Sequence, residues 1–162
     1  MRILGLDPGS RITGVGIIEG ETLVHAESIV LGGGDMPERL GLIFARVSEV
    51  IARYQPEMAA VETVFMSRNA QAAIKLGQAR GAAVCAAVAA GLAIHEYAPR
   101  AIKQAIVGRG GAAKEQVQHM TRILLKVDGK LGEDAADALA VALCHKHTAQ
   151  TQQRLPPGVV LR

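Results

Sequence analysis

Aromatic residues are scarce in this chain of 162 residues, which has no Trp, two Tyr and two Phe. Because large rings are missing, the core has to be built from aliphatic side chains and Ala. Hydrophobic residues make up 49% of the sequence, a share that suits a folded globular domain and excludes a disordered chain. The length allows one well-cored domain and is short for two. We therefore expect a single domain over residues 1–150, followed by a flexible tail at 151–162.

Cysteine is equally rare. Cys85 and Cys144 both fall in apolar helical patterns and are expected to be small buried hydrophobes in a reducing compartment, with no disulfide framework or CxxC site. The longest uncharged run, GAAVCAAVAAGLAI, is too short and too rich in Ala to cross a bilayer. The opening MRILGLDPG reaches an acid and a Pro-Gly turn too early for a secretory signal. These features predict a cytoplasmic protein without a membrane partner.

Hydrophobic patterning predicts an α/β domain. RILGLD, RITGVGIIEG and ETLVHAESIVL are typical of three strands in an antiparallel meander, and MAAVETV and LAIHEY of two more. Helices are expected at about 37–53, with Phe44 on the buried face, and at 69–90, 99–107, 114–126 and 133–147. This order favours a mixed five-stranded sheet flanked by helices. The first and fourth strands could then lie side by side, with their ends at the edge where open α/β sheets place their sites.

Four acidic side chains interrupt these apolar segments. Asp7 ends MRILGL, Glu62 breaks MAAVETVF, and Asp134 and Asp137 stand in EDAADALAVAL. A buried carboxylate is costly unless it is paired, hydrogen-bonded or bound to a cation. Acids that share a site also raise each other's pKa, which a cation between them relieves. The four acids therefore predict a divalent-metal site, and hard oxygen ligands favour Mg²⁺ or Mn²⁺ over Zn²⁺.

Such a site suggests phosphodiester chemistry. Two divalent ions held roughly 3.5–4 Å apart could clamp a phosphodiester between an attacking water and the leaving oxygen. Residues 63–126 hold nine basic and two acidic side chains, whereas residues 1–62 hold five basic and nine acidic ones. A basic block beside an acidic cluster suits an enzyme that acts on a polyanion, although a solvated helix face explains the charge equally well. Asp7 as a turn residue and Asp134 as an acid at a helix start are the simpler alternatives.

Four segments in order, MRILGLDPGSRITGVGII, VETVFMSRNAQAAIKLGQARG, KQAIVGRGGAAKEQVQHM and EDAADALAVA, resemble the RuvC family of crossover (Holliday) junction endodeoxyribonucleases over about residues 1–147. The resemblance implies a ribonuclease-H-like fold and a homodimer that nicks two strands of a four-way DNA junction symmetrically during recombination and repair. It also implies Mg²⁺ dependence, with two ions expected in each site, and work alongside the branch-migration proteins RuvA and RuvB. The family's catalytic acids fall on Asp7, Glu62, Asp134 and Asp137.

The resemblance adds basic and aromatic residues. Lys103 and Lys114 match lysines near the scissile phosphate, where a cation would stabilise charge that develops in the transition state. Phe65 would stack on an unpaired base at the junction centre, a contact type worth roughly 1–3 kcal/mol. The plain alternatives are solvated helix lysines and a core Phe at a strand end. Further DNA contacts are expected at Arg68, Lys75, Arg80 and Arg109, the first three of which could equally line a dimer interface.

Other functions stay open at this point. The related YqgF-type nucleases, which act on RNA, share the opening motif. A junction-binding dimer whose acids hold only structural metal is another alternative. The sugar-kinase and actin group also has a phosphate loop after a strand ending in Asp-x-Gly, but those proteins are far longer and repeat the fold. His119 and His145 are expected to be ordinary helix residues and not catalytic bases.

Overall fold

The computed structural model describes residues 1–63 and 69–156. Its elements follow the chain in this order: β1 (Arg2–Asp7), β2 (Ile12–Glu19), β3 (Thr22–Val30), α1 (Met36–Tyr54), β4 (Met58–Glu62), α2 (Ala70–Ala89), β5 (Ala93–Tyr97), α3 (Pro99–Val107), α4 (Lys114–Leu124) and α5 (Glu133–Arg154). The strands form one sheet in the order β3-β2-β1-β4-β5. β1, β2 and β3 pair antiparallel, whereas β4 runs parallel to both β1 and β5. The predicted mixed five-stranded sheet is confirmed.

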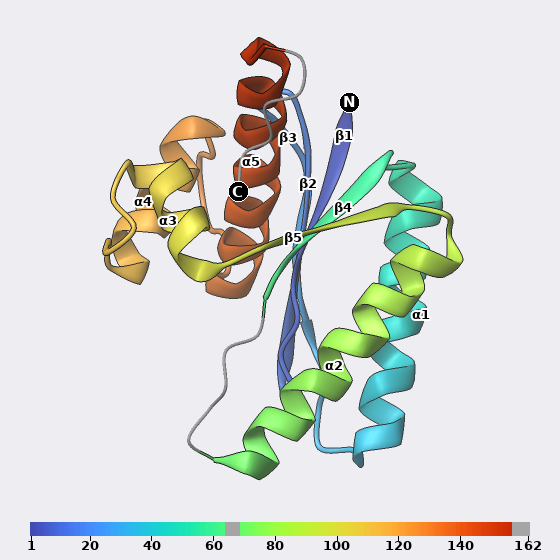
Figure 1. The fold of residues 1–162 in the computed structure, drawn as a ribbon. Helices are drawn as coiled ribbons and strands as arrows, with labels where there is room; N and C mark the ends of the chain where they lie inside the picture. Colours follow the sequence, from blue (N-terminus) through green and yellow to red (C-terminus); the bar gives the residue numbers. More distant parts are fainter. Residues whose placement is uncertain (64–68, 157–162) are drawn as a thin grey trace.

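Helices cover both faces of the sheet, α1 and α2 on one side and α3, α4 and α5 on the other (Figure 1). Alternation along β1 divides its side chains between two cores: Leu4 and Leu6 pack on the side of α1 and α2, and Ile3 on the side of α5. Both cores are aliphatic and rich in Ala, as the scarcity of aromatics requires.

Two glycines let α5 lie directly on the sheet. Gly5 of β1 and Gly14 of β2 face its first turns, and a Cβ at these positions would overlap the backbone oxygens of Ala138 and Asp134. Glycine is the residue that permits such close backbone approach within a strand. The pair therefore fixes where the acidic start of α5 sits relative to the strand ends.

The helix α1 begins as the sequence indicates, because the side chain of Asp35 accepts a hydrogen bond from the backbone N–H of Glu38 at 3.0 Å. The prediction for Phe44 is wrong: this side chain is 41% exposed. The buried stripe runs through Ile43 and Val47, and Phe44 lies about 100° around the helix from Ile43, past the edge of that stripe.

Two further expectations need correction. Cys85 is exposed on α2, whose buried face is built from Ala residues, and only Cys144 is buried. The last helix does not end near His147 but continues to Arg154, because its Thr- and Gln-rich continuation holds no Gly or Pro before Pro156. No helix within residues 1–63 and 69–156 has the length and apolar character needed to cross a bilayer.

Candidate active site

Sheet topology brings the two strand acids together. Asp7 and Glu62 are the last residues of β1 and β4, which are neighbours and run parallel, so both carboxylates emerge at the same edge. The N-terminal turns of α5 lie across this edge and supply Asp134 and Asp137. Asp7, Glu62 and Asp137 line one cavity of about 330 Å³, together with Lys103 and Lys114. Three of the four predicted acids and both predicted lysines thus share a cavity.

The acids act on one another electrostatically. Burial, followed by repulsion from Asp137, Glu62 and Asp134, raises the pKa of Asp7 from 3.8 to about 7. Burial and then Asp137 also raise the pKa of Glu62, against the opposing effect of Lys103 and Lys114. Asp134 does not line the cavity, but its charge reaches Asp7, so all four acids belong to one electrostatic cluster.

Asp137 is held by two side chains of α4. Lys114 Nζ lies 2.8 Å from Asp137 Oδ2, and Gln118 Nε2 donates a hydrogen bond to Asp137 Oδ1 at 3.0 Å. This contact with Asp137 is the main reason that the pKa of Lys114 is raised. Gln118 was missed from the sequence, where its signal is the spacing: it stands one helical turn after Lys114 and so shares its face.

The strand end that carries Glu62 is tied from two directions. Thr63 donates its backbone N–H to Tyr97 O of β5 at 2.9 Å. From α2, Arg80 Nε donates to the backbone oxygen of Glu62 at 3.3 Å, and its guanidinium forms an ion pair with Glu96. The predicted contact residue Arg80 is therefore engaged with the protein in this structure.

The donor chemistry of the cluster fits a hard divalent cation, because all four acids offer carboxylate oxygens and their repulsion is what a cation would neutralise. Within the described ranges, however, no three His, Cys, Asp or Glu side chains are placed to hold an ion. Asp137 shows one cause: Lys114 and Gln118 engage both of its oxygens. Binding a metal would require Asp137 to exchange at least one of these contacts.

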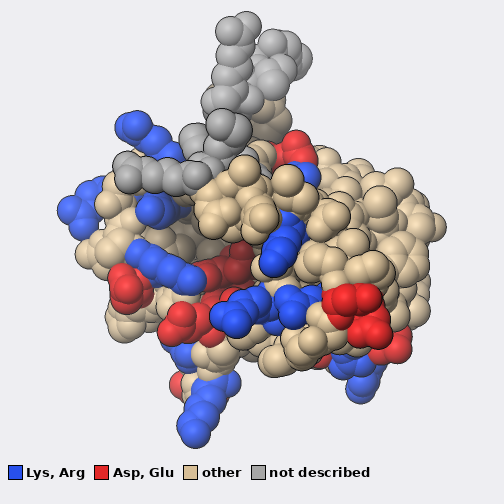
Figure 2. Space-filling model, turned by 90° about the horizontal axis from the view of Figure 1, so that it is seen from below, with Lys and Arg blue, Asp and Glu red and all other residues tan. Residues whose placement is uncertain are grey.

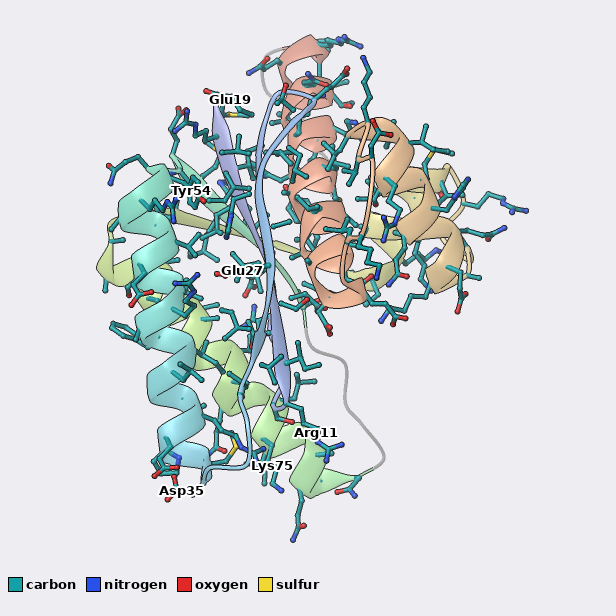
Figure 3. The ribbon with its side chains drawn as sticks, turned by 180° about the vertical axis from the view of Figure 1, so that it is seen from behind. Arg11, Glu19, Glu27, Asp35, Tyr54 and Lys75 are labelled. Carbon is teal, nitrogen blue, oxygen red and sulfur yellow. The ribbon has the colours of Figure 1, made fainter. Side chains whose placement is uncertain are left out.

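Basic side chains surround the acids. Figure 2 shows acidic groups in a hollow of this face, with Lys and Arg on either side of it. Lys103 is half-buried, whereas Lys75 on α2 and Arg109 between α3 and α4 are exposed. Arg11, which follows the first strand and was not singled out from the sequence, projects with Lys75 at the end of the molecule where α2 begins (Figure 3). The predicted contacts of Phe65 and Arg68 lie outside the described residues.

The histidines stand apart from this cavity. His145 is buried, and its Nδ1 lies 2.7 Å from the hydroxyl of Tyr97. Burial and the nearby His95 lower the pKa of His145 to about 4, so its ring is neutral at physiological pH. His119 is exposed on α4. Neither residue lines the acidic cavity, in keeping with the expectation that they are ordinary helix residues.

The family model and the curated relatives that match this chain name the same family. The family model described as crossover junction endodeoxyribonuclease RuvC matches residues 3–145. A crossover junction endodeoxyribonuclease RuvC from Alkalilimnicola ehrlichii is 54% identical over 158 residues, which covers 95% of this chain and 96% of that protein.

Solved structures that resemble this chain include members of the same family. The Thermus thermophilus RuvC in complex with a Holliday junction substrate superimposes with a TM-score of 0.87 at 39% identity, covering 94% of this chain and 96% of that one. The yeast mitochondrial Holliday junction resolvase Ydc2, at 10% identity and a TM-score of 0.66, shares the fold. The predicted ribonuclease-H-like fold is confirmed. This chain belongs to the RuvC family of crossover junction endodeoxyribonucleases.

Proposed function

We propose that this protein is a structure-selective endonuclease that resolves Holliday junctions by paired, symmetric nicks in homologous recombination and DNA repair. The observation that carries the proposal is the cavity shared by Asp7, Glu62 and Asp137 with Lys103 and Lys114. Acids at this density repel one another and need a cation, and the basic rim suits a polyanion. The Thermus thermophilus relative in complex with a Holliday junction substrate supports the choice of polyanion.

The four acids Asp7, Glu62, Asp134 and Asp137 would hold the metal, for which we propose Mg²⁺, with Mn²⁺ as a substitute and two ions in each site. Bound there, the ions would supply a polarised phosphoryl oxygen and an activated water. The residues of the chain do the positioning: β1 and β4 fix Asp7 and Glu62 at one edge, and α5 carries the other two acids. Lys103 and Lys114, which line the same cavity, would neutralise charge on the phosphate as the P–O bond breaks.

Symmetric nicking needs two active sites, and we propose that the protein is a homodimer. The exposed face of α2 supports a self-complementary surface: Ile74 and Val88 are 62% and 56% exposed, and Cys85 lies between them. Gly81 also belongs to this surface, because residues 74, 81, 85 and 88 lie on one side of the helix. Small and apolar residues in such a stripe allow two helices to approach closely.

Cleavage of defined substrates by wild type and Asp7→Asn tests the function. With Mg²⁺ present, we expect paired symmetric nicks in a four-way junction and none in a linear duplex or an RNA hybrid of matched sequence. Asp7→Asn should bind the junction and fail to cut it, because it removes one carboxylate from the cluster. Cutting of the RNA hybrid in place of the junction would favour the YqgF-type alternative. Normal cutting by Asp7→Asn would contradict the active-site assignment.

The cellular setting follows from this activity. The proposed substrate is a DNA junction, so we propose that the protein works where the chromosome lies, in the bacterial cytoplasm. RuvA and RuvB, which migrate the branch point, are the proposed partners, on the family resemblance alone. A pull-down of purified RuvA and RuvB on a junction, with and without this protein, tests for a shared complex.

A further inference from the structure

Arg80 is a predicted DNA contact on α2 whose side chain instead bonds to groups of the protein itself. Its side chain is 21% exposed, whereas Lys75, on the same helix, is exposed. Arg80 Nε donates to the backbone oxygen of Glu62 at 3.3 Å, and Nη2 bonds to a carboxylate oxygen of Glu96. One guanidinium thus bridges the end of β4 and the neighbouring strand β5.

The end of β4 needs such support. The recorded pairing between β1 and β4 reaches Leu6 and Val61, whereas the pairing between β4 and β5 continues to Glu62 and Tyr97. Arg80 reaches this position from α2, on the face of the sheet opposite α5 (Figure 1). The carboxylate of Glu62 lines the acidic cavity while its backbone is held from α2.

We infer that Arg80, oriented by Glu96, is a positioning residue that fixes the strand end carrying Glu62 and thereby the geometry of the acidic cavity. The inference rests on the proposed function, since it assigns a supporting part to the same site. Two N–H groups of the Arg80 guanidinium already donate hydrogen bonds to Glu62 and Glu96. Lys75 is therefore the better phosphate contact on α2. A displacement of about 1 Å in a reacting group can cost roughly 100-fold in rate, so this support has a measurable consequence.

Four variants separate positioning from DNA contact: Arg80→Gln, Arg80→Lys, Glu96→Gln and the control Lys75→Gln. Junction cleavage at saturating junction and Mg²⁺ gives kcat, and junction binding without metal gives affinity and its salt dependence. We expect Arg80→Gln to lower kcat roughly 10- to 100-fold while junction affinity changes less than about 3-fold. Lys75→Gln should do the reverse, weakening binding and lowering the salt slope by about 1.

Glu96→Gln is the decisive variant, because removing an acid cannot remove a favourable phosphate contact. If Glu96 orients Arg80, Glu96→Gln lowers kcat in the same direction as Arg80→Gln, and the double variant is no worse than Arg80→Gln alone. Arg80→Lys keeps the charge but cannot donate to Glu62 and Glu96 through a planar guanidinium. Its kcat should therefore fall between those of wild type and Arg80→Gln.

A second readout does not depend on cleavage. Mn²⁺ alone, titrated into the DNA-free protein and followed by thermal shift, should need a higher midpoint concentration for Arg80→Gln and Glu96→Gln, and an unchanged one for Lys75→Gln. The inference is overturned if Arg80→Gln weakens junction binding with a shallower salt slope while Glu96→Gln leaves kcat and the Mn²⁺ midpoint unchanged. Should Arg80→Gln fail to fold, Glu96→Gln carries the test. Absence of junction cleavage by wild type would instead contradict the proposed function, and the Mn²⁺ midpoints would still decide on positioning.

Discussion

At the scale of single residues, burial and mutual repulsion set the properties of the acids. Burial and three neighbouring carboxylates disfavour the charged form of Asp7 and raise its pKa to about 7. The sequence identified Asp7 as an acid at the end of an apolar run. It could not predict that Lys114 and Gln118 would engage Asp137, because these contacts depend on how α4 packs against α5.

The raised pKa of Asp7 predicts that the metal-free protein loses stability as pH rises. The folded-state pKa lies above the ordinary aspartate value of 3.8, so the folded state binds this proton more tightly than the unfolded state. The stabilising contribution is complete below about pH 4 and is lost as pH rises through about 7. The loss is on the order of 4 kcal/mol, because each pK unit corresponds to about 1.4 kcal/mol.

Urea unfolding in EDTA at several pH values measures this loss for wild type and Asp7→Asn. The variant has no charge to desolvate at this position, so we expect it to be more stable than wild type at pH 8 and to depend less on pH. Added Mg²⁺ should stabilise wild type at pH 8 and have little effect on Asp7→Asn. Parallel pH curves for the two proteins would show that burial of Asp7 is not costly.

At the scale of elements, the positions of helices and strands followed from local patterning, and the failures came where packing decides. The antiparallel meander, the strand of Glu62 and the start of α1 lie where hydrophobic period and capping indicate. Phe44 lies outside the buried stripe because the orientation of α1 on the sheet, which local spacing does not specify, selects Ile43 and Val47. The same reasoning applies to Cys85, which α2 presents to solvent.

The close contact of α5 with the sheet predicts a large effect of Gly14→Ala. An added Cβ would meet the backbone of Asp134 and push the start of α5 away from β2. We expect a loss of roughly 1–3 kcal/mol in the free energy of unfolding, together with weaker Mg²⁺ stabilisation, because Asp134 and Asp137 move with the helix. Urea unfolding with and without Mg²⁺ measures both effects.

Gly41→Ala is the matched control for this variant. Gly41 lies in the exposed part of α1, with open space where a Cβ would stand. Alanine favours the helix over glycine, so this change should stabilise the protein by about 0.5–1 kcal/mol. If Gly14→Ala and Gly41→Ala changed the free energy of unfolding equally, the role assigned to Gly14 would be contradicted.

At the scale of the whole molecule, the proposed dimer follows from the exposed face of α2. A dimer that pairs this face brings two copies of Cys85 close together, while the second cysteine, Cys144, is buried. A short bis-maleimide should therefore link the wild-type chain to a species of twice its mass, and Cys85→Ser should abolish the product. Denaturing gel electrophoresis after a brief reaction in dilute solution measures the amount of this cross-linked product.

Val88→Asp tests the same surface independently. A charge placed within this apolar helix contact is left without a partner, so the variant should be monomeric by light scattering, with its fold intact by circular dichroism. The interface would lie on another face if wild type is dimeric but gives no product cross-linked through Cys85, and if Val88→Asp is dimeric as well.

The sequence by itself determined the five strands, the approximate helices and the four acids, because local periodicity and the cost of an acid in an apolar run are written along the chain. It also determined the family, through four ordered motifs. Only the tertiary structure decided which side chains meet: Gln118 with Asp137, and Arg80 with the backbone of Glu62. These contacts join segments on different elements, and their distance is set by sheet order and helix packing, which no local pattern specifies.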